Sequence, residues 1–97
     1  MLYNVEITDL AKMEIKNIAN YIYKSSFSEE IANKFYDEIY SKIYSLSIFP
    51  EMHPKYNENY RVLTFKKKYR IFYNINKKNV IINYIFSTSQ DYWELLY

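Results

Sequence analysis

Hydrophobic and polar residues alternate at the start of the chain and then recur at helical spacing. From Leu2 to Ile7 apolar side chains alternate with polar ones, which is the period of a half-buried strand. Thr8 and Asp9 are typical helix-starting residues, and the apolar positions after them follow a four–three–four spacing. This spacing predicts a helix of about 16 residues whose buried stripe consists of Ala11, Ile15, Ile18 and Ile22.

A second helix is predicted after the serine-rich segment Ser25–Ser28, which is expected to end the first helix. Ser28 is a suitable N-cap, and the two glutamates that follow it place negative charge where a helix N-terminus favours it. Pro50 is expected to stop any helical continuation. The two segments predict a helical hairpin, in which the second helix buries Ala32, Phe35, Ile39, Ile43 and Leu46.

Three strand-like runs follow a polar loop at residues 50–59. The segment Asn76–Asn79 is expected to form a tight turn between the last two runs, because asparagine tolerates left-handed backbone angles. The last run is apolar on both faces except at Asn83, as expected of a strand inside a sheet. The predicted strands are Tyr60–Phe65, Tyr69–Ile75 and Val80–Phe86.

The resulting order, β-α-α-β-β-β, predicts a single α+β domain over residues 1–97. In such a domain the two-helix hairpin packs on one face of a small, mostly antiparallel sheet. The first strand precedes the helices, so it has to return to the sheet beside a later strand. Ser87–Ser89 are placed to cap a short C-terminal helical tail that carries Tyr92, Trp93, Leu95 and Leu96.

The opposite face of the predicted sheet has no helix to cover it. If Arg70, Phe72 and Asn83 lie on this face, it is a concave surface that combines charge with aromatic area. An exposed surface of this kind indicates a binding site for a partner or a substrate.

Composition removes several classes of function. The chain has no glycine, so neither of the glycine-rich phosphate loops can be built. It has no cysteine and one histidine, His53, which excludes disulfides, thiolate nucleophiles and cysteine- or histidine-rich metal centres. We therefore expect no metal and no cofactor. The net charge of +2 permits a nucleic-acid partner without requiring one.

The 13 tyrosines indicate little by themselves. Tyrosine, isoleucine, lysine and asparagine have AT-rich codons and make up almost half of the chain, so we attribute the tyrosine count mainly to codon usage. No apolar run approaches the roughly 18 residues of a membrane span. The N-terminus lacks the basic start and apolar core of a signal peptide, so a soluble, cytoplasmic protein with no membrane partner is expected.

Several segments, taken in their order along the chain, resemble one family. They are "YNVEIT", "SLSIFPEMHPKY", "YRVLTF", "YRIFYNI" and "IFSTSQDYWELL". Through them the chain from about Tyr3 to Leu96 resembles the RelE/ParE superfamily of bacterial type II toxins, whose order of elements is the one predicted above. The resemblance implies a co-expressed antitoxin as partner. It also implies one of two activities: the ribonuclease branch cuts mRNA in the ribosomal A site, and the gyrase-poisoning branch blocks DNA replication.

The resemblance also implies candidate catalytic residues. Arg70, in "YRIFY", matches the phosphate-binding arginine of the ribonuclease members, and Arg61 matches a second basic position. Metal-independent RNA cleavage needs a stabilised phosphorane and a protonated leaving oxygen. The arginines would meet the first need. Tyr92 would meet the second if nearby cations lowered its pKa, which is ordinarily about 10. Nine residues separate the two arginines, which allows neighbouring antiparallel strands.

Two departures from the ribonuclease pattern weigh against efficient acid–base cleavage. Leu63 stands at a position that is basic in those members. The segment Ser87–Gln90 stands where they have a histidine or an arginine, and serine does not titrate near pH 7.

A short basic run provides candidate RNA contacts. Lys66, Lys67 and Lys68, together with Gln90, are candidates for binding RNA phosphates, which would give salt-dependent affinity without sequence preference. The alternative is that the lysines form an ordinary exposed corner supplied by AT-rich codons.

The remaining candidates have simpler explanations. His53 and the loop carboxylates Glu51 and Glu58 are better explained as ordinary loop residues than as proton carriers. A row of tyrosines at i, i+4 and i+8 on the second helix indicates packing more than base stacking, which favours an exposed sheet or loop; the row is Tyr36, Tyr40 and Tyr44.

Three functions from different classes remain open. The first, favoured by Arg61 and Arg70, is a ribosome-dependent mRNA endonuclease that inhibits translation. The second is a ParE-type poison of DNA gyrase that acts by binding; the segment Ser87–Gln90 favours either this function or the third. The third is a catalytically degenerate paralogue that binds an antitoxin and has no target. The codon preference, the oligomeric state and the face covered by the antitoxin also remain open.

Overall fold

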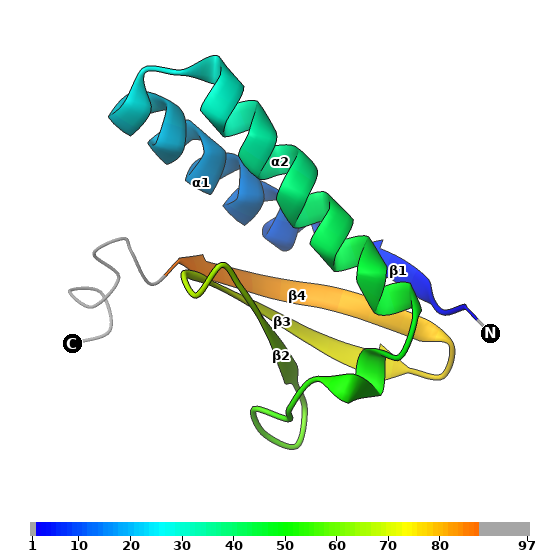
Figure 1. Ribbon diagram of the computed structural model, residues 1–97. Coiled ribbons are helices and arrows are strands. Elements are labelled where there is room, and N and C mark those ends of the chain that lie inside the picture. Colours follow the sequence, from blue (N-terminus) through cyan, green and yellow to red (C-terminus); the bar gives the residue numbers. More distant parts are fainter. Residues whose placement is uncertain (1, 88–97) are drawn as a thin grey trace.

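A helical hairpin lies over one face of a mixed sheet in the computed structural model, which describes residues 2–87 (Figure 1). The predicted order of helices and strands is confirmed, with two short 3₁₀ turns between the hairpin and the last three strands. The elements are β1 (Asn4–Ile7), α1 (Asp9–Ser26), α2 (Glu29–Tyr44), η1 (Ser45–Ser47), η2 (Pro50–Met52), β2 (Arg61–Phe65), β3 (Tyr69–Asn76) and β4 (Asn79–Ser87). The predicted C-terminal tail lies outside the described residues.

The strands of the described region follow the order β1-β4-β3-β2 in one sheet. β4 pairs antiparallel with β3, and β3 pairs antiparallel with β2. β1 returns to the sheet beside β4 and runs parallel to it, as far as the pair Ile7–Ile82. β4 is therefore an interior strand, as its apolar sequence predicts.

Side-chain caps start both helices at the predicted residues. The Thr8 hydroxyl accepts a hydrogen bond from the N–H of Ala11 at 3.1 Å, and Ser28 begins α2 in the same way. α1 ends at Ser26, within the segment Ser25–Ser28 that was predicted to end it, and its 18 residues slightly exceed the predicted length of about 16. Phe27 then ends it in a left-handed conformation with φ of 54°. The hydroxyl of Ser26 bonds to the Ile22 carbonyl, a contact that a helical residue can make.

The segment that follows α2 is more ordered than the predicted polar loop. Two 3₁₀ turns, η1 and η2, connect the helix to the sheet, and Pro50 at the start of η2 is buried. The carbonyl of Pro50 accepts a hydrogen bond from the Tyr73 hydroxyl at 2.5 Å. Burial raises the pKa of Tyr73 to about 12, so this donor keeps its proton at physiological pH.

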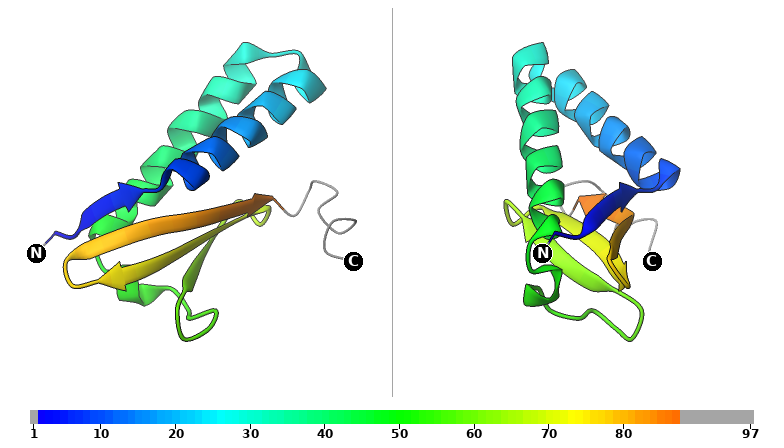
Figure 2. Two further views of the ribbon diagram at one scale, coloured as in Figure 1. Left: turned by 180° about the vertical axis from the view of Figure 1, so that it is seen from behind. Right: turned by 90° about the vertical axis from the view of Figure 1, so that its right-hand side faces the viewer.

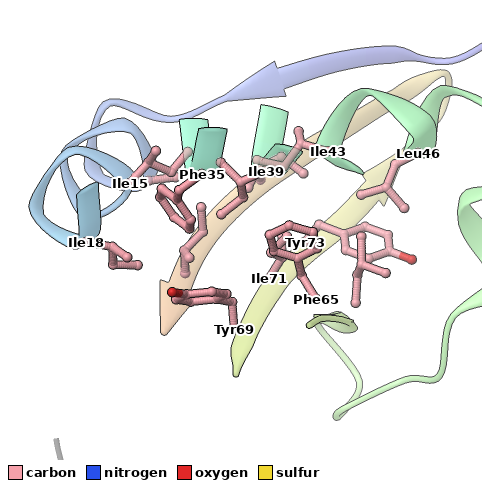
Figure 3. Close-up of a cluster of buried hydrophobic side chains, with 14 of the residues drawn as sticks. Ile15, Ile18, Phe35, Ile39, Ile43, Leu46, Phe65, Tyr69, Ile71 and Tyr73 are labelled. Atoms are coloured by element: carbon pink, nitrogen blue, oxygen red, sulfur yellow. The ribbon is translucent and has the colours of Figure 1, made fainter. Parts of the chain in front are cut away.

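The core lies between the hairpin and the covered face of the sheet (Figures 2 and 3). The predicted stripes of both helices are buried, apart from Ile22, which is half-buried. From β3, the alternate residues Tyr69, Ile71 and Tyr73 point into the same cluster (Figure 3). The ring centroids of Tyr69 and Phe35 are 5.1 Å apart, so β3 and α2 pack against each other through these two aromatic rings.

The C-terminal half of β4, after Ile82, extends beyond its pairing with β1. α1 lies along the strand edge that is left without a partner strand. Thr8 donates its hydroxyl to the carbonyl of Asn83 at 3.4 Å. Six residues further along the chain, Glu14 of α1 accepts a hydrogen bond from the backbone N–H of Ile85 at 2.9 Å. These two side chains form hydrogen bonds with backbone groups of β4 that a longer β1 would otherwise pair. Pairing matters here because unpaired backbone groups on an edge strand can bind strands of other molecules.

Because the chain has no glycine, other residues adopt the left-handed backbone conformation. Within residues 2–87 they are two phenylalanines and three lysines. In the β3–β4 turn the left-handed residue is Lys77, with φ of 58°, and not one of the asparagines, which contradicts the expectation for that turn. A left-handed residue with a Cβ costs roughly 1–2 kcal/mol. The described left-handed positions are Phe27, Phe49, Lys66, Lys67 and Lys77.

Glu14 should make stability depend on pH. Burial raises the pKa of its carboxyl group, and the Ile85 N–H opposes that shift. A raised pKa in the folded state stabilises the fold below the unfolded pKa, about 4.3, and this contribution is lost as pH rises through the folded pKa. We expect Glu14→Gln to flatten the pH profile of the unfolding free energy in this window. Glu14→Ala should lose about 1–3 kcal/mol, because the Ile85 N–H is left without an acceptor. Urea unfolding from pH 3.5 to 7.5 measures both effects; an unchanged profile in Glu14→Gln would contradict this.

Lys77→Gly should stabilise the protein by about 0.5 kcal/mol. The substitution removes the left-handed penalty of a residue with a Cβ, and the greater freedom of glycine in the unfolded chain offsets part of the gain. Thermal unfolding should show a rise of a few degrees for a domain of this size. As a control, glycine at the neighbouring Lys78, which has no positive φ, should lower the melting temperature.

Candidate functional site

The face of the sheet turned away from the helices is the candidate site, and we call it the open face. Arg70 and Phe72 of β3 lie opposite Phe86 and Tyr84 of β4. Residues that pair across strands share a face, and successive residues on a strand alternate between faces. The predicted placement of Arg70 and Phe72 on one uncovered face is therefore confirmed.

Aromatic rings from the sheet and the preceding loop gather on the open face. Phe72 is edge-on to Tyr56 at 5.0 Å and to Phe86 at 5.7 Å. Tyr84 stacks with Phe86 at 6.5 Å and lies 5.7 Å from Tyr60. We call these five residues the ring cluster. Its rim is exposed, since 61% of Tyr56 and 39% of Phe86 are accessible to solvent.

An irregularity in the β3–β4 ladder widens this aromatic area. Phe72 pairs with Tyr84 and Tyr73 pairs with Ile82, which leaves Asn83 as an extra residue. Such a bulge places two consecutive residues on the same face. The amide of Asn83 donates to the Asn74 side chain at 2.6 Å, so the predicted position of Asn83 on the open face is also confirmed.

Arg70 is the cation of the open face beside the ring cluster. Its side chain is exposed, and it makes no hydrogen bond or ion pair with any of residues 2–87. An arginine next to aromatic rings can bind a carboxylate or a phosphate bidentately while its plane stacks on a ring. Arg70 is thus available for a partner.

Arg61 lies on the covered side and has a structural role. Its Nη1 donates to two backbone carbonyls of the loop, those of Glu51 at 2.9 Å and His53 at 2.7 Å. These bonds fasten the η2 segment to the start of β2. The structure therefore does not bring Arg61 and Arg70 together, although their strands are neighbours as predicted. Their catalytic roles stay predictions.

The length of the corner between β2 and β3 explains this separation. Phe65 pairs with Tyr69, so the corner contains three residues. Arg61 then lies opposite Tyr73, and Arg70 lies opposite Thr64. A corner of two or four residues would shift the register by one and put both arginines on one face, because side chains alternate with a period of two.

The three corner lysines differ in their surroundings. Lys66 donates to the Glu38 carboxylate of α2 at 2.8 Å, and its Nζ lies 5.6 Å from the centre of the Phe65 ring. Lys66 and Lys67 are both left-handed. The N–H of Lys68 bonds to the carbonyl of Phe65 at 3.2 Å. Lys66 is thus already paired within the fold, and the phosphate-binding role of the three lysines stays a prediction.

The loop carboxylate and histidine are placed for structure. Glu51 accepts a hydrogen bond from the Tyr3 hydroxyl at 2.5 Å, which holds the pKa of its carboxyl below the usual value, with Arg61 and Lys78 adding to the effect. His53 packs edge-on to Tyr73, and burial holds the pKa of its imidazole low. Both shifts keep these groups in the deprotonated form at neutral pH.

One phenol of the ring cluster, that of Tyr60, has a raised pKa. The side-chain hydrogen bond between Tyr60 and Tyr84 raises the pKa of Tyr60, and desolvation adds to the rise. The cluster contains no carboxylate or imidazole. Its members therefore supply ring surface and hydroxyl groups for binding, whereas proton transfer to a leaving oxygen at pH 7 needs a more acidic group.

Other candidates lie away from the open face or outside the description. Tyr36 and Tyr40 stack on each other and pack against the core, which confirms the packing interpretation for them, and Tyr44 continues the stack. Tyr92 and Gln90 lie outside the described residues.

A polar cleft of about 390 Å³ opens beside the start of β2. It contains the exposed Glu58 and is also lined by Glu51, Lys55, Asn57, Asn59, Tyr60, Arg61, Asn74 and Ile75. Over residues 2–87 no group of acidic, histidine or cysteine side chains is arranged to hold a metal ion. The same residues include no helix long and apolar enough to cross a membrane.

The ring cluster was largely missed by the sequence interpretation. Phe72 was identified, but Tyr84 and Phe86 were assigned only to an interior strand. Residue spacing alone would place Tyr84 and Phe86 on the covered face, because the two-residue β3–β4 turn without a bulge pairs Phe72 with Asn83; the bulge brings them to the open face. No spacing signal existed for Tyr56 and Tyr60, because a loop without regular structure has no periodicity.

Comparison with known proteins gives two findings. The sequence model of the family described as "ParE toxin of type II toxin-antitoxin system, parDE" matches residues 5–92. The solved structure described as "Chromosomal ParDE TA system from P. aeruginosa" is similar with a TM-score of 0.78, covering 91% of this chain and 98% of that one. At 17% identity this likeness establishes the fold alone. Among curated proteins no sequence matches this chain.

The different roles of the two arginines can be tested by stability. Arg61→Ala should lower the free energy of unfolding by about 1–3 kcal/mol, because two loop carbonyls lose a charged donor. Arg70→Ala should change it by less than about 0.5 kcal/mol, as is usual for an exposed side chain without partners. Urea unfolding at pH 7 provides the measurement. Equal losses in the two variants would rule out the structural assignment of Arg61.

Proposed function

Because the chain belongs to the ParE toxin family of type II toxin–antitoxin systems, we propose that it is a poison of DNA gyrase that acts by binding. The superfamily resemblance implies two activities, mRNA cleavage and gyrase poisoning. The family match favours the second, which was the alternative and not the main interpretation of the sequence. The proposal makes the protein a toxin whose partners are an antitoxin and gyrase.

The observation that carries the proposal is the composition of the open face. Arg70 stands beside five aromatic residues there, while Arg61 is occupied with loop carbonyls on the other side of the sheet. Cleavage of RNA would need several charged groups around one phosphate and a group that protonates the leaving oxygen. An exposed arginine within an aromatic surface is instead typical of the residues that dominate protein–protein affinity.

The electrostatics of the loop support the same view. The low pKa of Glu51 makes this carboxylate a weak base, and its hydrogen bond with Tyr3 occupies it. The low pKa of His53 leaves little imidazolium at neutral pH. Neither group is suited to act as an acid toward a leaving oxygen.

Two other functions are outcomes of the same experiment. A ribosome-dependent mRNA endonuclease would use Arg70 as a phosphate ligand, with Arg61 and Tyr92 as the further predicted catalytic residues. A degenerate paralogue would bind its antitoxin and affect neither gyrase nor translation.

Purified protein should inhibit supercoiling by gyrase and leave mRNA intact in a translating extract. Arg70→Ala should raise the concentration for half-inhibition at least tenfold, the usual effect of losing an interface arginine that dominates affinity. Lys16→Ala, which removes an exposed cation from α1, is the matched control and should stay within twofold of the natural protein.

The gyrase proposal would be wrong if mRNA were cut in the A site while supercoiling continued. The protein would then be a ribosome-dependent mRNA endonuclease. If both assays were unaffected and expression did not slow growth, the degenerate paralogue would be the correct description.

A further inference from the structure

A mainly apolar groove of about 310 Å³ lies between the C-terminal half of α1 and the ends of two strands. α1 contributes Ile18, Tyr21 and Ile22 to its walls, and the sheet contributes Tyr69 from the start of β3 and Ser87 from the end of β4. Ile18 and Tyr69 continue from the groove into the core (Figure 3). Tyr21 is exposed, so apolar surface that adjoins the core reaches solvent here.

The described part of the chain ends at this groove. Ser87 is the last described residue. It is buried and pairs with Tyr69, so both lie on the side of the sheet that the helices cover. Ten residues of the sequence, 88–97, follow. Five residues of extended chain span roughly 17 Å, which is enough for the residues from Tyr92 onward to turn back over a groove that begins at Ser87.

The composition of residues 88–97 suits an apolar groove. All but one of the last six residues carry large apolar or aromatic side chains; the six are Tyr92, Trp93, Glu94, Leu95, Leu96 and Tyr97. Soluble domains rarely leave a contiguous apolar surface of this kind in solvent. The segment has two carboxylates and no cation, and among the described residues that line the groove only Lys68 is charged. The segment therefore meets no like charge there.

We propose that residues 88–97 fill this groove of their own chain, with the Trp93 ring against Tyr21 and Ile22. The segment would extend the core between α1 and the sheet and withdraw Tyr21 from solvent. It would also hold Tyr92 on the covered side of the sheet, whereas Arg70 lies on the open face. The proposal goes beyond the gyrase proposal and does not depend on it, because it concerns the covered side and leaves the open face uncovered.

The covalent tether favours the groove of the same chain over that of a second copy. A segment joined by a few residues has an effective concentration of about a millimolar, which a second copy exceeds only in a concentrated solution. The open face is a poorer receptor for the segment, because its rings already pack on one another and only 9% of Phe72 is accessible to solvent.

Trp93 is the only tryptophan of the chain, so tryptophan fluorescence reports on this segment alone. The free peptide of residues 88–97 is the reference for an exposed indole. In the natural protein the emission should lie at shorter wavelength. Quenching by acrylamide should be at least about threefold weaker than in the peptide, because close packing excludes the quencher. In NMR spectra, nuclear Overhauser contacts should join the indole protons to methyl groups of Ile18 or Ile22.

Two tyrosines of α1 provide a matched pair of substitutions. Tyr21 and Tyr23 are 43% and 45% exposed, but Tyr21 lines this groove and Tyr23 lines a separate groove between the two helices. Tyr21→Asp removes part of the wall and adds a charge that repels Asp91 and Glu94. It should raise acrylamide quenching of Trp93 at least about twofold. Tyr23→Asp places the same charge near the same helix end and should leave quenching unchanged.

Quenching as strong as in the free peptide, or an equal effect of the two substitutions, would overturn the proposal. Protection found only in a protein that sediments as a dimer would assign the segment to a second copy and contradict the proposal. So would protection that is lost in Phe86→Asp and kept in Tyr21→Asp, because the segment would then lie on the open face. The Overhauser contacts in the natural sequence decide the matter even if Tyr21→Asp does not fold.

Discussion

Burial of the helical hairpin against a single face of the sheet is the constraint on which the rest of the structure depends. The stripes of α1 and α2 meet Ile71 and Tyr73 on the covered face, and no second layer exists in the described region. Because strand residues alternate between faces, every inward residue of β3 fixes an outward neighbour. Placing Ile71 in the core places Arg70 and Phe72 in solvent, so the core sequence and the open face are determined together.

The same alternation decides which residues cooperate. The three-residue corner sends Arg61 and Arg70 to opposite sides of the sheet, while the extra residue Asn83 brings Tyr84 to the side of Phe72. The length of the β2–β3 corner separates the two arginines, and the bulge at Asn83 brings the rings of Tyr84 and Phe86 to the face that carries Phe72. The open face therefore combines aromatic area with one arginine, Arg70, near the β2–β3 corner, the combination on which the proposed binding function rests.

Much of the fold could be predicted because its signals are local. The stripes, the caps at Thr8 and Ser28 and the interior character of β4 follow from spacing and residue type. The site was less accessible. The predicted strands already left the three-residue corner Lys66–Lys68, but its consequence, that Arg61 and Arg70 lie on opposite faces, was not drawn from the sequence. The contact of Arg61 with the loop carbonyls depends on η2, which residue spacing did not predict.

The absence of glycine connects these features to recognition. Without glycine the β2–β3 corner consists of three lysines, of which Lys66 and Lys67 are left-handed, and Lys66 forms an ion pair with Glu38 on α2. The corner is thus held in place by an ion pair and carries positive charge next to the open edge of β2. Edge and open face belong to the same hairpin but look in different directions, since backbone groups lie in the plane of a sheet and side chains project from it.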